Sequence, residues 1–166
     1  WSNNGNSGTY GNITLWDTSG VFDMSFAFLG MPTFNEDISG WNMTNVTNTQ
    51  GMFMDVTGFN QIISGWDMRS VVDMSGMFTN ASSFNQPLAN WNVESVKTTT
   101  AMFKGATAFD QAIGTWYMPE LLNTDHMFED ATSFDQDVKF WYMVNVTSTK
   151  SMFKGCTNYE TYGPTT

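Results

Sequence analysis

The chain has 166 residues, of which 41% are hydrophobic, 16% aromatic and only 13% charged. Its formal net charge is −10, and this acidic balance argues against nucleic acid or an anionic membrane surface as a partner, because both select for basic patches. No run of about 18 apolar residues occurs, so the sequence predicts no transmembrane segment.

Residues 1–15 are rich in Gly, Asn and Ser and predict an N-terminal arm or cap. Tyr10, Ile13 and Leu15 are its candidates for packing on the first repeat, and Tyr10 and Ile13 are also candidates for contacting a second chain. The chain begins at Trp1 and shows no signal-peptide pattern, so we expect a processed or trimmed product.

From residue 16 onward the sequence repeats itself every 25 residues, without insertions. Trp recurs at 16, 41, 66, 91, 116 and 141, and Phe recurs at 28, 53, 78, 103, 128 and 153. Further columns hold a second Phe (34 to 134, closed by Tyr159) and aliphatic residues (38 to 138). A fixed period of this length is the signature of a solenoid or a propeller.

Each repeat predicts one strand and one helical turn. The Trp-x-Met or Trp-x-Val centre alternates with period two, so copies such as 41–43 and 66–68 are expected to stack as parallel strands. The later spacing of Val46, Thr49, Met52 and Phe53 suits a short helical or 3₁₀ turn. The predicted fold is therefore an α/β repeat solenoid, leucine-rich-repeat-like, with six 25-residue coils, parallel strands on one face and short helical or 3₁₀ turns on the other.

The expected organisation is an arm or cap at 1–15, a six-coil solenoid at 16–159 and a C-terminal tail at 160–166. The last repeat, which holds Phe153 and Tyr159, looks like an interior coil. An uncovered last coil would expose a strand edge and favour the addition of another chain. Three explanations of this end remain open: head-to-tail assembly, a chain that is a fragment of a longer array, and protection of the strand edge by the tails.

The repeat resembles the BspA-like leucine-rich surface proteins, a family with repeats of similar length that was once labelled a domain of unknown function. The phrases "FNQPLANWNVESV", "MFKGATAFDQAIGTW" and "MFEDATSFDQDV" carry the resemblance, which spans residues 16 to 160. It implies an extracellular or cell-surface solenoid with roles in adhesion or surface architecture, and no catalytic residues. Glu36, Thr161 and Gly163 depart from the pattern, all in the terminal units.

Sequons predict N-linked glycans, although their number is no more than the composition would produce by chance. The candidate acceptors are Asn12, Asn42, Asn45, Asn80 and Asn145. Beside the Trp column, Tyr117 and Tyr142 are expected on the surface as ligand or subunit contacts, because exposed tyrosines are frequent at interfaces.

Other motifs have a structural explanation that is favoured over a chemical one. His126 lacks a nucleophile or a second histidine, and Cys156 fits a column of small buried residues. Asp110, Asp135 and Glu160 could form a carboxylate ladder for Ca²⁺, but the same column holds Asn in the earlier repeats. Threonines at 49, 99, 124 and 149 could form a flat hydroxyl row as in ice-binding solenoids, and the methionines could bind a soft metal. We predict no catalytic residue, no metal and no cofactor.

The predicted function is that of an extracellular structural protein, a glycosylated subunit assembling head-to-tail into a surface filament. The alternative is a cell-surface adhesin or ligand-binding module that uses the predicted strand face. Partners would then be other copies at the solenoid ends, or a ligand at Tyr117 and Tyr142.

Overall fold

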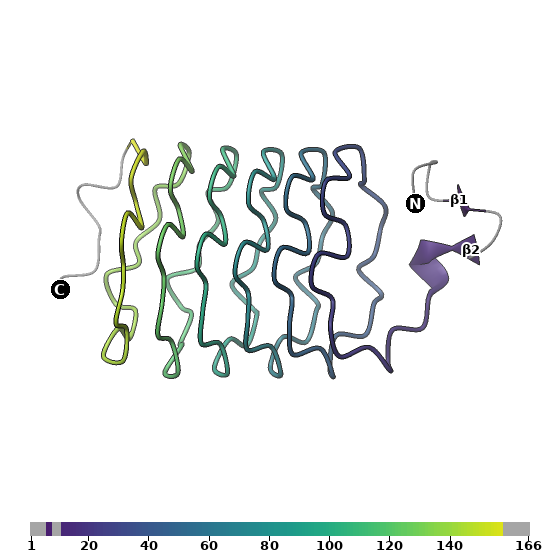
Figure 1. Cartoon of the computed structure of the whole chain (residues 1–166), viewed down its shortest axis with the longest axis horizontal. Coiled ribbons are helices and arrows are strands. Elements are labelled where there is room, and N and C mark those ends of the chain that lie inside the picture. Colours follow the sequence, from purple (N-terminus) through teal and green to yellow (C-terminus); the bar gives the residue numbers. More distant parts are fainter. Residues whose placement is uncertain (1–5, 8–10, 158–166) are drawn as a thin grey trace.

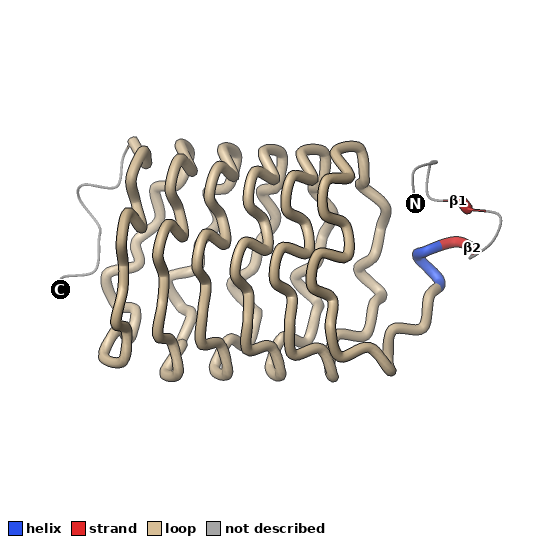
Figure 2. Tube along the Cα trace, viewed as in Figure 1, coloured by secondary structure: helices blue, strands red, loops and turns tan. Residues whose placement is uncertain are grey.

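The computed structural model describes residues 6–7 and 11–157. Two short antiparallel strands, β1 (Asn6–Ser7) and β2 (Gly11–Asn12), precede the 3₁₀ helix η1 (Ile13–Leu15). From residue 16 the chain winds through successive coils that lie side by side in a row (Figure 1). Loops and turns make up these coils along their whole described length (Figure 2).

Neighbouring coils are joined by a backbone ladder on one side. Single parallel bridges link equivalent residues of successive coils, at positions 23, 48, 73, 98, 123 and 148. After the bridge in the second coil, alternate backbone N–H groups donate to carbonyls of the third coil over 2.8–2.9 Å. The donors are Thr49, Gly51, Phe53 and Asp55. The bridges place each repeat directly beside the next with no shift in register.

The alternate N–H groups of this segment bond within their own coil. Met52, Met54 and Val56 each donate to the carbonyl three residues back, over 3.1 Å. Gly51 and Asp55 have positive φ angles of 58° and 62°. A right-handed helix of L-residues cannot continue through such positions, so the segment forms overlapping turns and not a helix.

The predicted position of the parallel strands was wrong. The Trp-centred segments form none of the bridges, and the ladder lies in the segment for which a helical turn was predicted. Trp41 donates its N–H to Ile38 at 3.0 Å and Val46 donates to Met43 at 2.9 Å, so the Trp segment is a short link between two turns. The assignment to the leucine-rich-repeat-like α/β class stays a prediction, since β1, β2 and η1 are the named elements in the described ranges.

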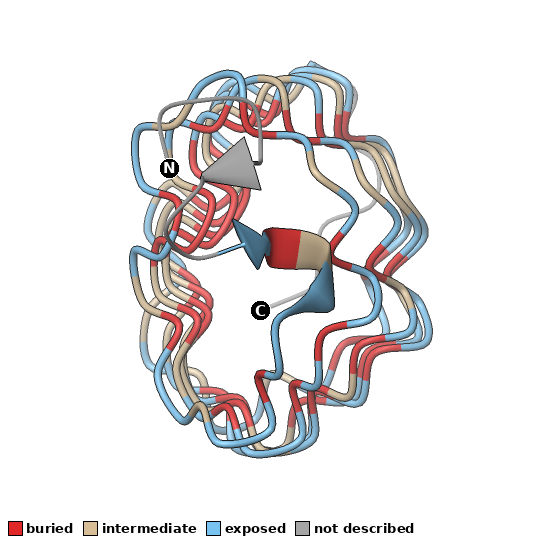
Figure 3. Cartoon of the chain, turned by 90° about the vertical axis from the view of Figure 1, so that its right-hand side faces the viewer, coloured by how far each residue is buried: buried red, intermediate tan, exposed pale blue. Residues whose placement is uncertain are grey.

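The interior of the coils is filled by stacked aromatic side chains. Phe53 lies 4.0 Å from Phe59 in its own coil and 5.5 Å from Phe78 in the next, measured between ring centroids. Both phenylalanine columns are fully buried in the middle coils. Viewed along the row, the buried residues line the inner side of the coil outline and the exposed residues its outer side (Figure 3). Each coil therefore completes its core only through its neighbours.

The tryptophan column combines packing with a repeated hydrogen bond. The indoles of Trp41, Trp66, Trp91, Trp116 and Trp141 are 3–6% exposed. Each Nε1–H donates over 3.0–3.2 Å to a carbonyl of the preceding repeat. For Trp41 this acceptor is Ile13, which is fully buried and continues the column of Ile38 and Ile63. The repeat register thus already holds in η1, which Figure 3 shows across the end of the outline.

A ladder of amide and carboxylate side chains runs along the turns after the second Phe column. Asn35 accepts the backbone N–H of Asn60 at 2.9 Å, and Asn60 accepts that of Asn85 at 3.0 Å. Asp110 continues the series by accepting from Asp135 at 3.0 Å. These side chains satisfy turn backbone between coils, which is a structural role of the kind that the sequence favours for this column over a Ca²⁺ site.

Candidate functional site

The two ends of the coil row carry opposite halves of the backbone ladder. In every interior step, N–H groups of one coil donate to carbonyls of the following coil. In the last described coil the N–H groups of Thr149, Ser151 and Gly155 occupy the donor positions and have no acceptor within the described part of the chain. Such an edge is able to pair with a further coil.

The first coil offers the matching acceptors. The carbonyls of Asp23, Ser25 and Leu29 stand at the acceptor positions of the ladder and receive no hydrogen bond from residues 6–7 or 11–157. One bond runs the other way at every step, from Thr47 N–H to the carbonyl of Phe22 at 2.9 Å, for example. The two ends are therefore complementary in donors, acceptors and register.

Charge also differs between the ends. Residues 16–40 contain four acidic residues, Asp17, Asp23, Glu36 and Asp37, and no basic one. Residues 141–157 contain Lys150 and Lys154 and no acidic residue. Hydrogen bonds from the Ser19, Ser25 and Ser39 side chains and N–H groups lower the pKa of Asp17, Asp23 and Asp37 below the usual value, so these carboxylates stay charged.

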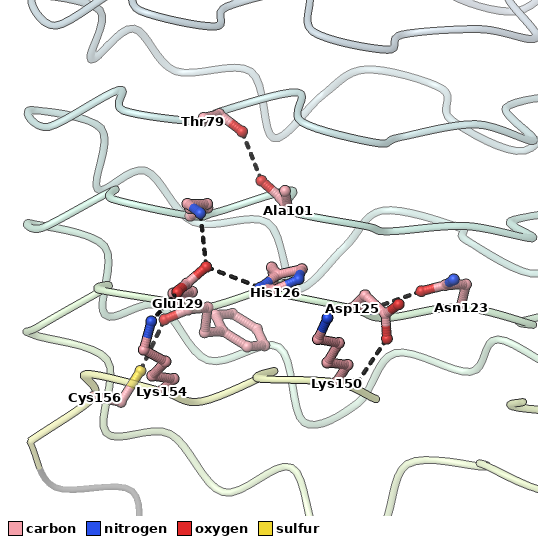
Figure 4. Close-up of polar contacts among 11 residues, drawn as sticks. Thr79, Ala101, Asn123, Asp125, His126, Glu129, Lys150, Lys154 and Cys156 are labelled. Carbon is pink, nitrogen blue, oxygen red and sulfur yellow. Dashed lines mark hydrogen bonds and ion pairs between the residues drawn. The ribbon is translucent and has the colours of Figure 1, made fainter. Parts of the chain in front are cut away.

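A charged cluster joins the last three coils on the ladder side (Figure 4). The carboxylate of Glu129 is 7% exposed and binds Lys104 at 2.7 Å, Lys154 at 2.6 Å and the Nδ1 atom of His126 at 2.9 Å. The hydrogen bonds from Lys104 and then Lys154 lower the pKa of Glu129 to about 2. Glu129 thus remains ionised near neutral pH and ties the final coil to its two predecessors.

The predicted arm and end contacts fall into three groups. Ile13 is fully buried, so it packs on the first coil and is not available to a second chain. Phe153 is partly buried and its ring stacks on Phe128 with centroids 5.3 Å apart, at the C-terminal end of the described row. Tyr10 and Tyr159 lie outside the described residues.

Tyr117 and Tyr142 lie next to each other on the outer surface. Their side chains are 53% and 42% exposed, and their ring centroids are 5.8 Å apart. Phe140 and Val144, 82% and 74% exposed, are close to them in the sequence. The last two coils therefore carry a small exposed apolar group beside the buried Trp column.

The five sequon asparagines are all exposed but differ in their side-chain bonds. Asn12 and Asn42 use only Oδ1, which accepts the N–H two residues later at 3.0 Å. In Asn45, Asn80 and Asn145 the Nδ2 atom, to which a glycan is attached, donates to the preceding coil over 2.8–2.9 Å. The Nδ2 atom therefore makes no hydrogen bond within the described residues at Asn12 and Asn42. At the other three candidate glycosylation sites it helps to join neighbouring coils.

Leu15, which the sequence predicts to pack on the first coil, is exposed instead, and sequence reasoning missed Phe140 in the same column of the repeat. Both side chains are 82% exposed. The signal was present in the alignment of repeats, because the interior members of this column are Gly40, Gly65, Asn90 and Thr115. Only the terminal coils place a large apolar residue at this outer position.

The chemical alternatives find little support in the described part of the chain. Thr49, Thr99 and Thr124 are fully buried, so the flat exposed hydroxyl row is wrong. Burial raises the pKa of Cys156 to about 11, and its Sγ donates to the Phe128 carbonyl at 3.0 Å. No group of three or more His, Cys, Asp or Glu side chains able to hold a metal ion occurs within residues 6–7 and 11–157.

These features define a repeat protein built from stacked 25-residue coils. The chain belongs to the family described as "Mycoplasma protein of unknown function, DUF285", whose model matches residues 3–116 and again residues 62–163. Two overlapping matches are expected of a tandem repeat. No curated protein and no solved structure matches the chain. In the described part of the chain no helix has the length and apolar character needed to cross a membrane.

Proposed function

We propose that this protein is an extracellular structural subunit that assembles head-to-tail into a surface filament and carries N-linked glycans. The single observation that carries the proposal is the complementarity of the ladder ends. If the first coil of one copy follows the last coil of another, Thr149, Ser151 and Gly155 donate to Asp23, Ser25 and Leu29 in the pattern of every interior step. Such a contact is heterologous, so it repeats into a filament unless it closes into a ring.

Two further features support this direction of assembly. The acidic first coil would meet the basic segment 141–157, so local charge favours the head-to-tail pairing over head-to-head. The stacked aromatic core supports a stiff rod, because each coil packs on its neighbours along the row. Asn42, in the second coil and away from the proposed junction, is the best placed glycan acceptor on the outside of such a filament.

The experiment compares the intact protein with a variant whose ladder end is blocked. Thr149→Pro removes one free N–H donor and breaks no hydrogen bond that this N–H makes within the described chain. Gly65→Ala serves as the matched control in a middle coil, where an added Cβ meets no atom within 4 Å. Electron microscopy and light scattering measure assembly, and circular dichroism and thermal unfolding measure the fold.

We expect filaments for the intact protein and for Gly65→Ala, and folded monomers for Thr149→Pro. The proposal is overturned if the intact, folded protein stays monomeric at every concentration tested. It is also overturned if Thr149→Pro assembles as readily as the intact protein, because the ladder end would then play no part.

A second candidate function is adhesion through the exposed Tyr117–Tyr142 pair. Adjacent exposed tyrosines favour ligand contact because they offer apolar area together with a hydroxyl group. An adhesin would be monomeric and would lose ligand binding in a Tyr117→Ala, Tyr142→Ala double variant. Membership of the BspA-like leucine-rich class, with its cell-surface location, is part of the same proposal and is supported by the repeated phrases of the sequence.

A further inference from the structure

The outer column that precedes each Trp distinguishes the terminal coils from the interior ones. Its members along the chain are Leu15, Gly40, Gly65, Asn90, Thr115 and Phe140. All six residues are exposed, and the two large apolar ones are each 82% exposed. In an isolated rod, bulky apolar side chains at these two exposed positions would contribute no buried apolar area. The interior members of the column are small or polar.

The ladder fixes where these two residues would meet. Leu15 lies eight residues before Asp23, and Phe140 lies eight residues before Ser148. In every interior step the bridges join equivalent positions of the repeat, so residues in one column are neighbours across the step. A following copy whose Asp23 bridges Ser148 therefore brings its Leu15 beside Phe140.

We propose that Leu15 of one copy packs on Phe140 of the preceding copy and fixes the register of the junction. This inference rests on the head-to-tail assembly proposed above and names its partner surface. The contact removes apolar area from water that each isolated end leaves exposed. A slip by two residues along the ladder, with Asp23 beside Lys150, would place Leu15 beside Tyr142, which is only 42% exposed and already contacts Tyr117.

The surroundings of Phe140 leave most of the residue open to an apolar partner. Lys139 lies over the ring with Nζ 5.0 Å from the centroid, and Asp137 binds the same Nζ at 2.8 Å. Phe140 is nevertheless 82% exposed, so most of its surface is open to another side chain. Leu15 ends η1 and is likewise 82% exposed.

Paired cysteines test this contact in full-length protein with Cys156→Ser as background. The test variant is Leu15→Cys with Phe140→Cys, oxidised with copper phenanthroline and examined on non-reducing gels. Trp rings one residue further along have centroids 6.3–6.5 Å apart between neighbouring coils, and disulfides span roughly 4.4–6.8 Å between Cα atoms. The slipped pair, Leu15→Cys with Tyr142→Cys, is the register control. Gly40→Cys with Gly65→Cys calibrates the chemistry within one chain, where loss of two free thiols reports closure.

We expect a ladder of covalent oligomers from the Leu15–Phe140 pair, closure of the Gly40–Gly65 pair and no oligomers from the slipped pair. If filaments form by electron microscopy and the calibration pair closes, but the Leu15–Phe140 pair stays uncrosslinked, the register is wrong although assembly stands. Crosslinking of the slipped pair alone overturns the register in the same way. If no variant and no intact protein associates at all, the proposed function fails and this contact fails with it.

A charge-based variant gives a second readout that does not depend on disulfide geometry. Phe140→Asp is expected to raise the concentration needed for assembly at least about tenfold, since it puts a charge in an apolar contact. Gly65→Asp, in the same column of a middle coil, is expected to leave that concentration unchanged. Equal effects of the two substitutions would contradict the proposed contact.

Discussion

The indole Nε1–H of Trp91 donates to the carbonyl oxygen of Ile63 in the preceding coil, over 3.0 Å. This bond repeats at every Trp from 41 to 141. A large apolar ring is thereby buried without leaving its single donor unpaired, which would otherwise cost free energy. The period of the repeat is thus held by a hydrogen bond as well as by packing.

Replacing Trp91 with Phe should lower the free energy of unfolding by about 1–3 kcal/mol, through the lost hydrogen bond and the lost ring volume. In the variant the carbonyl of Ile63 still accepts a hydrogen bond from the backbone N–H of Trp66, so it is not left unpaired and adds little to the cost. Urea unfolding followed by circular dichroism measures the change. Tyr117→Phe, at a half-exposed side chain, is the control and should stay within about 0.5 kcal/mol of the parent.

Glu129→Gln should remove part of the acid sensitivity of the protein. Lys104 and Lys154 lower the pKa of Glu129 to about 2, against an ordinary value of 4.5. A lowered folded-state pKa contributes stability that is present above the ordinary value and is lost as the pH falls toward 2. The variant should therefore be less stable than the parent at pH 6, and the difference should vanish near pH 2.

Urea midpoints at a series of pH values from 2 to 7 check this expectation. Asp137→Asn is the comparison, because Lys139 also lowers the pKa of Asp137 while the carboxylate is 41% exposed. Its effect should be smaller, since solvent screens an exposed pair. A constant gap between Glu129→Gln and the parent across the whole range would contradict the role given to ionised Glu129.

Lys150→Glu should weaken end-to-end association, because it places an acid in the segment that would face the acidic first coil. Lys97→Glu is a matched control with the same change in net charge in a middle coil, also at an exposed side chain. Light scattering against protein concentration measures both. Similar weakening by the two variants would show that total charge, and not the charge of the end, governs assembly.

Protein from a secretory host should carry a glycan at Asn42 and an unmodified side chain at Asn80. Asn80 has a positive φ of 57°, its Nδ2 donates to Asp55 at 2.8 Å, and a Cβ on Gly105 would meet its Oδ1. A glycan there would push two coils apart, so folded material should be depleted of it. Peptide mapping by mass spectrometry measures occupancy, and a fully modified Asn80 in folded protein would contradict the prediction.

Much of the core could be predicted from the sequence, because burial follows the residue type at each place in the period. The Trp column is buried from Trp41 to Trp141, and the two Phe columns are buried from 28 to 128 and from 34 to 134, as expected of large apolar residues in a shared interior. The family model that matches the chain covers the repeated phrases, from residue 3 to residue 163. The finer resemblance to the BspA-like leucine-rich proteins stays a prediction. The register starts earlier than the sequence indicated, at Ile13, because the Gly- and Asn-rich context hides a single matching residue.

The sequence by itself determined the 25-residue period and which side chains face inward, because burying large apolar groups depends little on backbone detail. Tertiary structure decided where the coils pair. A three-residue alternation around Trp41 and a three-three-one spacing after Val46 do not distinguish a strand from a series of turns. The positive φ angles at Gly51 and Asp55 make that choice, since they release every second N–H for the next coil. The donors left at Thr149, Ser151 and Gly155, and the acceptors left at Asp23, Ser25 and Leu29, follow from that pairing alone.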